Sequence, residues 1–165
     1  MLENGAPLRQ NEENRYLEIL GLTWNELQGK RVLDIGAGSG SFARSAHHRG
    51  IQVISLDNST KRWDAAHQDG FETSLVVADM ARLSSEFEPE SFDLVVSIAS
   101  LYSENDAQNT LPEVFTVLKP GGELRATVNY SQEFIESLSK RVGFSSRTLN
   151  KIAAPWNGFY VVLKK

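Results

Sequence analysis

The chain alternates short apolar runs with longer amphipathic segments. The apolar runs are built mainly from Val, Ile, Leu, Ala and Phe, and they predict strands at residues 31–35, 51–56, 73–78, 92–98 and 123–129. The segments between them have apolar residues three and four positions apart, and they predict helices at 39–49, 59–68, 106–118 and 131–142, with a further helix at 11–20. Strands that alternate with helices in this way are typical of a parallel sheet with helices on both faces.

Turn-forming residues mark the ends of these elements. Residues 21–30 are expected to form a turn, and the Lys-Pro-Gly-Gly sequence at 119–122 predicts another one before the fifth strand. Near the end of the chain, Asn157 and Gly158 separate two more predicted strands, at 146–152 and 159–163. Both residue types accept the positive φ of a type I′ turn, so we expect the last two strands to be antiparallel.

The first strand runs into a glycine-dense segment, residues 36–40, that predicts a tight turn at the start of a helix. Glycines allow positive φ and close approach of the backbone to a ligand, and N–H groups at a helix start can point at that ligand. The dinucleotide fingerprint requires a third glycine where this chain has Ser41. Asp34, just before the turn, would also repel a pyrophosphate. The sequence therefore disfavours a nucleotide-dependent oxidoreductase.

An acidic strand end followed by Gly36, Gly38 and Gly40 closely resembles the first motif of the class I S-adenosylmethionine-dependent methyltransferases. The turn at 119–122 and the antiparallel chain end also resemble this family, and the resemblance covers residues 29–165. It implies an α/β fold: a doubly wound, mostly parallel seven-stranded sheet with an antiparallel C-terminal strand. We expect one domain over 1–165, with a core at 29–165 and an N-terminal helical segment, 1–28, in which residues 16–24 could fold over the cofactor as a lid.

The resemblance implies S-adenosylmethionine as cofactor and gives roles to the polar residues at the strand ends. Asp34 would face the methionine end, Asp57 the ribose hydroxyls, and Asp79 the adenine amino group beside the main-chain N–H of Met80. Asp57 and Asp79 also have a local alternative, because Asp after a strand often caps a helix or a turn. The predicted cofactor contacts are Asp34, Gly36, Ala37, Gly38, Gly40, Asp57, Asn58, Asp79, Met80 and Ser97.

The loop after the fourth strand faces the methyl group in the family that this chain resembles. It lacks the Asn/Asp-Pro-Pro-Tyr motif of many enzymes that methylate exocyclic or amide nitrogens. We nominate Glu104 as a general base and Tyr102 as its hydrogen-bonding partner, with a helix cap as the alternative role of Glu104. Asn129, Tyr130 and Phe134 are expected to line the acceptor side.

Other conspicuous side chains have simpler interpretations. Trp63 could cover an adenine, but an aromatic residue on a helix more often fills the core. His47 and His48 stand late in a helix and away from the strand ends, so we expect them at the surface. The acidic residues between 86 and 90 lack the His or Cys spacing of a transition-metal site, and no metal is expected.

Composition narrows the class of protein. The 165 residues suit one domain, and 41% hydrophobic with 23% charged residues is ordinary for a soluble protein. The absence of cysteine excludes disulfides, and the net charge of -4 disfavours a nucleic acid partner. No apolar run is long enough to span a membrane, so a membrane partner is also disfavoured. The N-terminus does not have the pattern of a signal peptide.

These observations together predict a cytoplasmic S-adenosylmethionine-dependent methyltransferase, a transferase of the EC 2.1.1 type, acting on a small-molecule acceptor. Two alternatives stay open: a catalytically silent S-adenosylmethionine-binding module with a regulatory or scaffold role, and a methyltransferase acting on RNA or protein. An aminopropyl transferase would need a further acidic amine site, which the sequence does not reveal.

Overall fold

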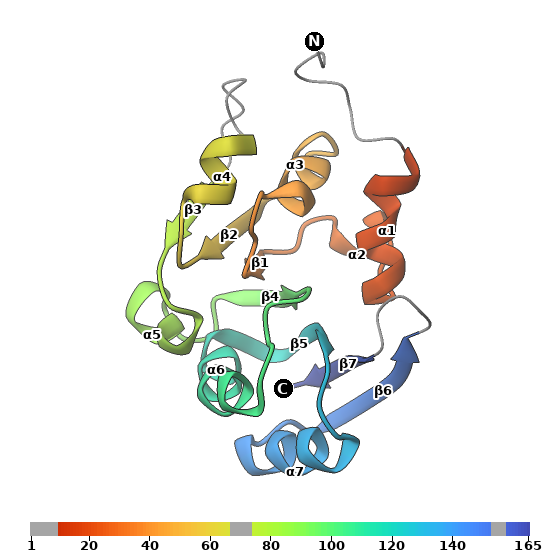
Figure 1. The fold of residues 1–165 in the computed structure, drawn as a ribbon, viewed down its shortest axis with the longest axis vertical. Helices are drawn as coiled ribbons and strands as arrows, with labels where there is room; N and C mark the ends of the chain where they lie inside the picture. The colour runs from red at the N-terminus through yellow and green to blue at the C-terminus, as the bar shows by residue number, and fades with distance from the viewer. Residues whose placement is uncertain (1–9, 67–73, 153–157) are drawn as a thin grey trace.

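The structure is a computed structural model that describes residues 10–66, 74–152 and 158–165 (Figure 1). Its centre is a seven-stranded sheet with the strand order β3-β2-β1-β4-β5-β7-β6. The strands are β1 (Val32–Ile35), β2 (Val53–Asp57), β3 (Ser74–Val77), β4 (Phe92–Ser97), β5 (Leu118–Val128), β6 (Ser146–Ile152) and β7 (Gly158–Lys164). β1 to β5 pair in parallel, whereas β7 is antiparallel to both β5 and β6. The expected fold class is therefore confirmed.

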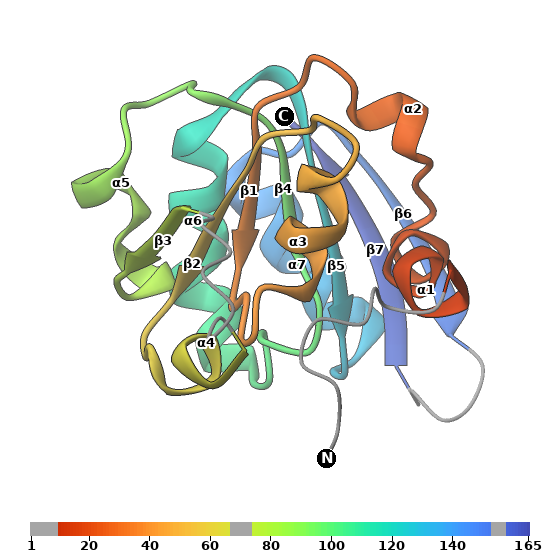
Figure 2. The same cartoon turned by 90° about the horizontal axis from the view of Figure 1, so that it is seen from above.

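Helices cover both faces of the sheet (Figures 1 and 2). They are α1 (Gln10–Leu20), α2 (Trp24–Leu27), α3 (Ser41–His47), α4 (Lys61–Ala66), α5 (Leu83–Glu86), α6 (Glu104–Val117) and α7 (Gln132–Val142), with a 3₁₀ turn η1 (Met80–Arg82). α1, α2 and α3 belong to one apolar cluster and α6 and α7 to the other. Neighbouring residues of β1 divide between the clusters, with Val32 in the first and Leu33 in the second, because successive side chains of a strand point to opposite faces.

Two local expectations were wrong. No separate turn forms at 119–122, because β5 begins at Leu118 and runs through the glycines as an irregular strand. Gly121 has a φ of +78°, and its N–H donates to the main-chain oxygen of Lys165 at 3.1 Å, so the glycines bend β5 without ending it. The segment 21–30, expected to be a turn, contains the helix α2, and a capping box formed by Thr23 and Glu26 stabilises the N-terminal end of this helix.

The antiparallel pairing of the last two strands is confirmed. Of the residues predicted to form their turn, Asn157 lies outside the described residues, and Gly158 is the first residue of β7. The helix predicted at 106–118 begins slightly earlier, at Glu104, because Ser103 is its N-cap.

Candidate functional site

Two pockets open side by side at the carboxyl ends of the first four strands. The α1 pocket, named for the helix that walls it, has a volume of about 440 Å³, and the α4 pocket has a volume of about 430 Å³. Gly36, Arg62, Ala99 and Tyr102 line both pockets, so the two form one continuous cleft. A cleft at this edge, where the strand order reverses between β1 and β4, is where open α/β sheets bind ligands.

The glycine turn is tied to the rest of the protein. The N–H groups of Gly36 and Ala37 donate to the main-chain oxygen of Leu56 at 2.8 and 3.0 Å, and that of Gly38 donates to Oδ2 of Asp57 at 2.9 Å. Gly40 N–H donates to the oxygen of Ala37 at 2.9 Å. The glycines therefore serve close approach of the chain more than donation to a ligand, in contrast to the expectation from the sequence.

Gly36 shows why close approach is needed. Its φ is +72°, and a Cβ on it would stand 2.2 Å from the Cβ of Ser100. Ser100 follows β4, and its hydroxyl donates to the main-chain oxygen of Ile35 at 3.0 Å. The absence of a side chain at residue 36 thus lets the loop after β4 approach the end of β1.

The third glycine of the motif has a packing role. A Cβ on Gly40 would lie 2.4 Å from the ring of Trp63, which is buried. Gly40 lines neither pocket, so its predicted contact with the cofactor is not supported by the geometry. Trp63 is a core residue, as expected, and it requires residue 40 to be glycine.

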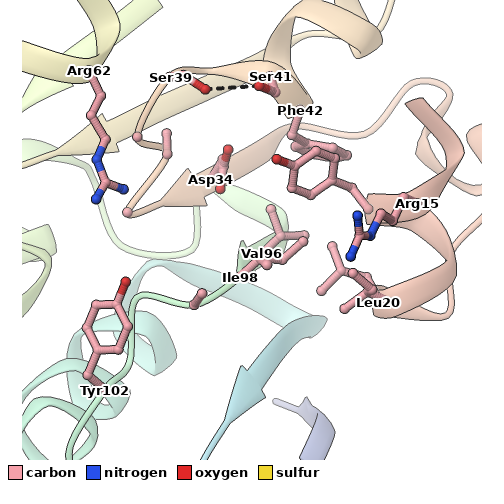
Figure 3. A pocket seen from close by; sticks show the side chains of 16 residues that line it. Arg15, Leu20, Asp34, Ser39, Ser41, Phe42, Arg62, Val96, Ile98 and Tyr102 are labelled. Carbon is pink, nitrogen blue, oxygen red and sulfur yellow. Dashed lines mark hydrogen bonds between the residues drawn. The ribbon is translucent and has the colours of Figure 1, made fainter. Parts of the chain in front are cut away.

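Asp34 is a buried carboxylate that lines the α1 pocket. Figure 3 shows it at the centre of the pocket. Within residues 10–66, 74–152 and 158–165, no group donates a hydrogen bond to its side chain. Burial, and in second place the negative charge of Asp57, raises the pKa of Asp34 to about 7. The positive charge of a bound ligand would stabilise the ionised carboxylate and so lower its pKa again. The site therefore fits the ammonium group of an amino acid.

Two arginines that sequence reasoning missed also line the α1 pocket. Arg15 comes from α1 and Arg62 from α4, and Figure 3 shows them on opposite sides of Asp34. Across the described part of the chain, neither guanidinium has an acidic partner. No local motif indicates Arg15, because only the packing of α1 on the sheet brings it to the cleft. The resulting pocket presents a buried negative charge together with exposed positive charges.

The predicted residues after β2 and β3 come together in the α4 pocket. Asp57, Asn58, Asp79 and Met80 all line it. The local alternatives occur as well, since Oδ1 of Asp57 accepts from the N–H of Ser59 at 3.1 Å and Oδ1 of Asp79 accepts from the turn that it caps. A carboxylate accepts about four hydrogen bonds, so both groups keep capacity for a ligand.

The two residues nominated for catalysis separate in the structure. Tyr102 is 70% exposed and lines both pockets. Glu104 is exposed, lines neither pocket, and is the first residue of α6. Its alternative role as helix cap is wrong, because Ser103 is the cap, whereas its role as a general base stays a prediction. The acidic residue of α6 that reaches the cleft is Asp106, whose Oδ2 accepts from the N–H of Ser103 at 2.9 Å.

Ser97, a predicted cofactor contact, lies away from both pockets. It is fully buried, its hydroxyl is hydrogen-bonded to that of Ser100, and it lines neither pocket. A parallel strand is apolar on both faces, so the alternation of its residues does not show which one reaches the cleft. Ile98 and Ala99, just after β4, take that place.

The segment after β5 does not line the cleft. Asn129, Tyr130 and Phe134 belong to neither pocket. The rings of Tyr130 and Phe134 pack edge to face with centroids 5.4 Å apart, and burial raises the pKa of Tyr130 above its usual range. Apolar packing against the core therefore holds Tyr130 and Phe134 away from both pockets, and their contact with an acceptor stays a prediction.

The N-terminal segment is part of the cleft wall, as the lid prediction requires. Tyr16, Ile19 and Leu20 line the α1 pocket. Trp24 instead stacks on Phe42, with centroids 6.2 Å apart and an interplanar angle of 14°. Movement of this segment stays a prediction.

In the part of the chain that the structure describes, no group of three or more His, Cys, Asp or Glu side chains could hold a metal ion. His47 and His48 are exposed, as expected. None of the described helices combines the length and apolar character needed to cross a membrane.

Comparison with known proteins adds a family and relatives. A family model described as a methyltransferase domain matches residues 33–126. The chain is 34% identical over 102 residues to a ubiquinone biosynthesis O-methyltransferase of Hahella chejuensis, covering 59% of this chain and 42% of that protein. It is 30% identical over 121 residues to the protein of the same name from Vibrio cholerae, covering 72% and 49%. The chain thus spans about half the length of these relatives.

Solved structures share the fold over most of the chain. A protein from Pyrococcus horikoshii superimposes with a TM-score of 0.75 at 19% identity, covering 94% of this chain and 90% of that one. An S-adenosylmethionine-dependent methyltransferase from Mesorhizobium loti superimposes with a TM-score of 0.73 at 19% identity, covering 85% and 93%.

Proposed function

The chain belongs to the methyltransferase-domain family, and from this premise we propose that it transfers a methyl group from S-adenosylmethionine to a small-molecule acceptor. The observation that carries the proposal is the buried carboxylate of Asp34, which lines the α1 pocket without a donor from the described residues. An amino acid ammonium would supply that donor. Arg15 and Arg62 provide positive charge in the same pocket, where they can receive the amino acid carboxylate or an anionic acceptor group.

The α4 pocket is assigned to the adenosine. Asp57 would accept hydrogen bonds from the ribose hydroxyls, with Asn58 beside it, and Asp79 would accept one from the adenine amino group. The main-chain N–H of Met80 would meet a ring nitrogen. Gly36 lines both pockets, so the cofactor would cross from one to the other over this glycine.

S-adenosylmethionine, when bound, supplies a methyl group on a cationic sulfur that leaves as a neutral thioether. The contribution of the protein is to align the acceptor with that methyl group and to exclude water, which in favourable cases lowers a barrier by about 7 to 11 kcal/mol. Ile19, Leu20, Phe42 and Ile98 give the α1 pocket an apolar wall for this purpose. Tyr102, at the junction of the pockets, would hydrogen-bond the acceptor.

A small-molecule acceptor is supported by the name of the relatives, ubiquinone biosynthesis O-methyltransferase. Enzymes acting on RNA or protein remain the alternative, as does a catalytically silent module that binds the cofactor without turnover. The net charge of -4 argues against general attraction to RNA. We also propose a cytoplasmic location for the protein, as expected from the sequence.

Calorimetric titration with S-adenosylmethionine, S-adenosylhomocysteine and NAD tests the cofactor. Binding of the first two without NAD supports the proposal, whereas binding of NAD alone would overturn it. Transfer of a radiolabelled methyl group to a panel of phenols, thiols and amines then tests the reaction. Tight cofactor binding with no transfer to the panel, to RNA or to protein would favour the silent module.

A further inference from the structure

Arg125 of β5 is a cation almost enclosed by the protein, with 15% of its side chain exposed. Its Nη1 donates to the main-chain oxygens of Leu20 and Gly21 at 3.2 and 2.6 Å, and to the hydroxyl oxygen of Tyr160 at 3.1 Å. Its Nε and Nη2 both donate to Oε2 of Glu123, at 3.1 and 3.0 Å. One side chain thus joins α1, β5 and β7.

The bonds to α1 fall at its C-terminal end, where helix carbonyls lack partners within the helix and a positive charge is favourable. Gly21 follows the helix with a φ of +57°, and a Cβ on it would be 3.0 Å from the hydroxyl of Tyr160. The chain therefore turns away from α1 against Arg125 and Tyr160. Figure 2 shows α1 on the β7 side of the sheet.

The same helix walls one half of the cleft only. Arg15, Tyr16, Ile19 and Leu20 line the α1 pocket, and no described residue of α1 lines the α4 pocket. Leu20 has a double role, because its side chain lines the α1 pocket and its carbonyl accepts from Arg125. A shift at the Arg125 contact would therefore move the pocket wall.

External contacts must hold α1 in place. A helix of 11 residues is marginal by itself in water. Leu17 and Leu20 bury apolar side chains, which favour contact with the sheet but do not set the position of the helix along it. Directional hydrogen bonds from an enclosed guanidinium do set such a position.

We propose that Arg125 is a positioning residue for the cofactor site: it fixes the C-terminal end of α1 on the sheet and so sets where Arg15 meets the methionine end of the cofactor. The inference rests on the proposed function. Arg125 itself lines neither pocket and lies outside every motif identified in the sequence.

The test compares two probes in calorimetry. S-adenosylhomocysteine carries the amino acid end of the cofactor. 5′-Methylthioadenosine lacks this end, so it would bind mainly through its adenosine part in the α4 pocket. In Arg125→Met we expect a loss of affinity for S-adenosylhomocysteine on the order of tenfold, with little change for methylthioadenosine. Arg125→Lys keeps the charge and should recover part of the loss. Arg147→Met is the matched control, because Arg147 forms a more exposed ion pair with Glu136 on another part of the surface.

A double variant, Arg15→Met with Arg125→Met, should lose less affinity for S-adenosylhomocysteine than the sum of the two single losses. The reason is that Arg125 acts through the placement of Arg15, so its effect is largely absent once Arg15 has been replaced. An equal loss for both probes would indicate general destabilisation and overturn the inference, as would unchanged binding of S-adenosylhomocysteine. If Arg125→Met does not fold, Tyr160→Phe removes one contact of Arg125 and must show the same selective loss. Failure of the wild-type chain to bind either probe would instead remove the proposed function.

Discussion

The main-chain N–H of Gly38 donates to Oδ2 of Asp57 at 2.9 Å, which ties the turn after β1 to the end of β2. The carboxylate therefore has two tasks at one place. It holds the glycine turn, and it lines the α4 pocket where a ribose would lie. This relationship makes Asp57 the residue whose removal should affect the cofactor most directly.

Asp57→Ala should weaken S-adenosylhomocysteine binding by about 2 kcal/mol, or roughly thirtyfold, because charge-assisted hydrogen bonds to the ligand are lost. Asn58→Ala, at the neighbouring lining residue, is the control and should have a smaller effect. Calorimetry measures both. The ribose assignment does not survive if Asp57→Ala binds as tightly as the wild type.

The stability of the empty protein should depend on Asp34. Its pKa is about 7 in the folded chain against an ordinary value of 3.8, so the folded state holds a proton that the unfolded state has released between these pH values. The free energy of unfolding should therefore decrease by a few kcal/mol as pH rises from about 4 to about 7, relative to Asp34→Asn. Urea unfolding of both chains at several pH values checks this. Parallel pH profiles would contradict it.

Cofactor binding should show the opposite dependence on Asp34. An ammonium group pairs with the ionised carboxylate, so affinity for S-adenosylhomocysteine should fall as pH drops below about 7, the pKa of Asp34 in the empty protein. Methylthioadenosine has no ammonium group and serves as the control. Equal pH dependence for the two ligands would place the ammonium group elsewhere.

Gly36→Ala and Gly29→Ala separate backbone strain from crowding. Both glycines have positive φ, +72° and +71°, but only Gly36 faces an atom within 4 Å of an added Cβ. Gly29→Ala should cost about 1 kcal/mol, and Gly36→Ala about 2 to 4 kcal/mol, because a clash with Ser100 adds to the strain. Urea denaturation gives both values. Equal losses of unfolding free energy would mean that the loop after β4 moves away from the added Cβ at little energetic cost.

Tyr102 and Glu104 should differ in methyl transfer. Tyr102 lines both pockets and Glu104 lines neither, so Tyr102→Ala should reduce transfer several-fold while Glu104→Gln leaves it unchanged. Both variants are assayed with the same acceptor at saturating cofactor. A strong loss of methyl transfer in Glu104→Gln would instead support its predicted role as a general base.

The fold and the lining of the α4 pocket were predictable because their signals are local. Each strand end carries its own polar residue, and parallel topology brings Asp34, Asp57 and Asp79 to one edge without further information. Ser97 and Tyr130 line neither pocket, because the direction of a side chain near a strand end depends on packing. The hydroxyl of Tyr130 is buried without a hydrogen-bond partner among the described residues, an arrangement that no sequence pattern indicates.

Arg15 and Arg125 show where prediction from sequence stops. Arg15 reaches the cleft only through the docking of α1, and that docking uses carbonyl groups that accept from a residue 105 positions away from Leu20. Main-chain acceptors leave no trace in the sequence. The wall of the α1 pocket therefore depends on long-range contacts that only the folded chain contains.

The place of β7 in the sheet has a consequence for how the chain folds during synthesis. β7 lies between β5 and β6, although both are made before it. Until residues 158–164 have left the ribosome, β5 is paired on its β4 side only, and Arg125 lacks the hydroxyl of Tyr160. A nascent chain could then form β1 to β4 while the wall of the α1 pocket stays unfinished. The α1 pocket should consequently become able to bind a ligand only after β7 has been made and has inserted beside β5.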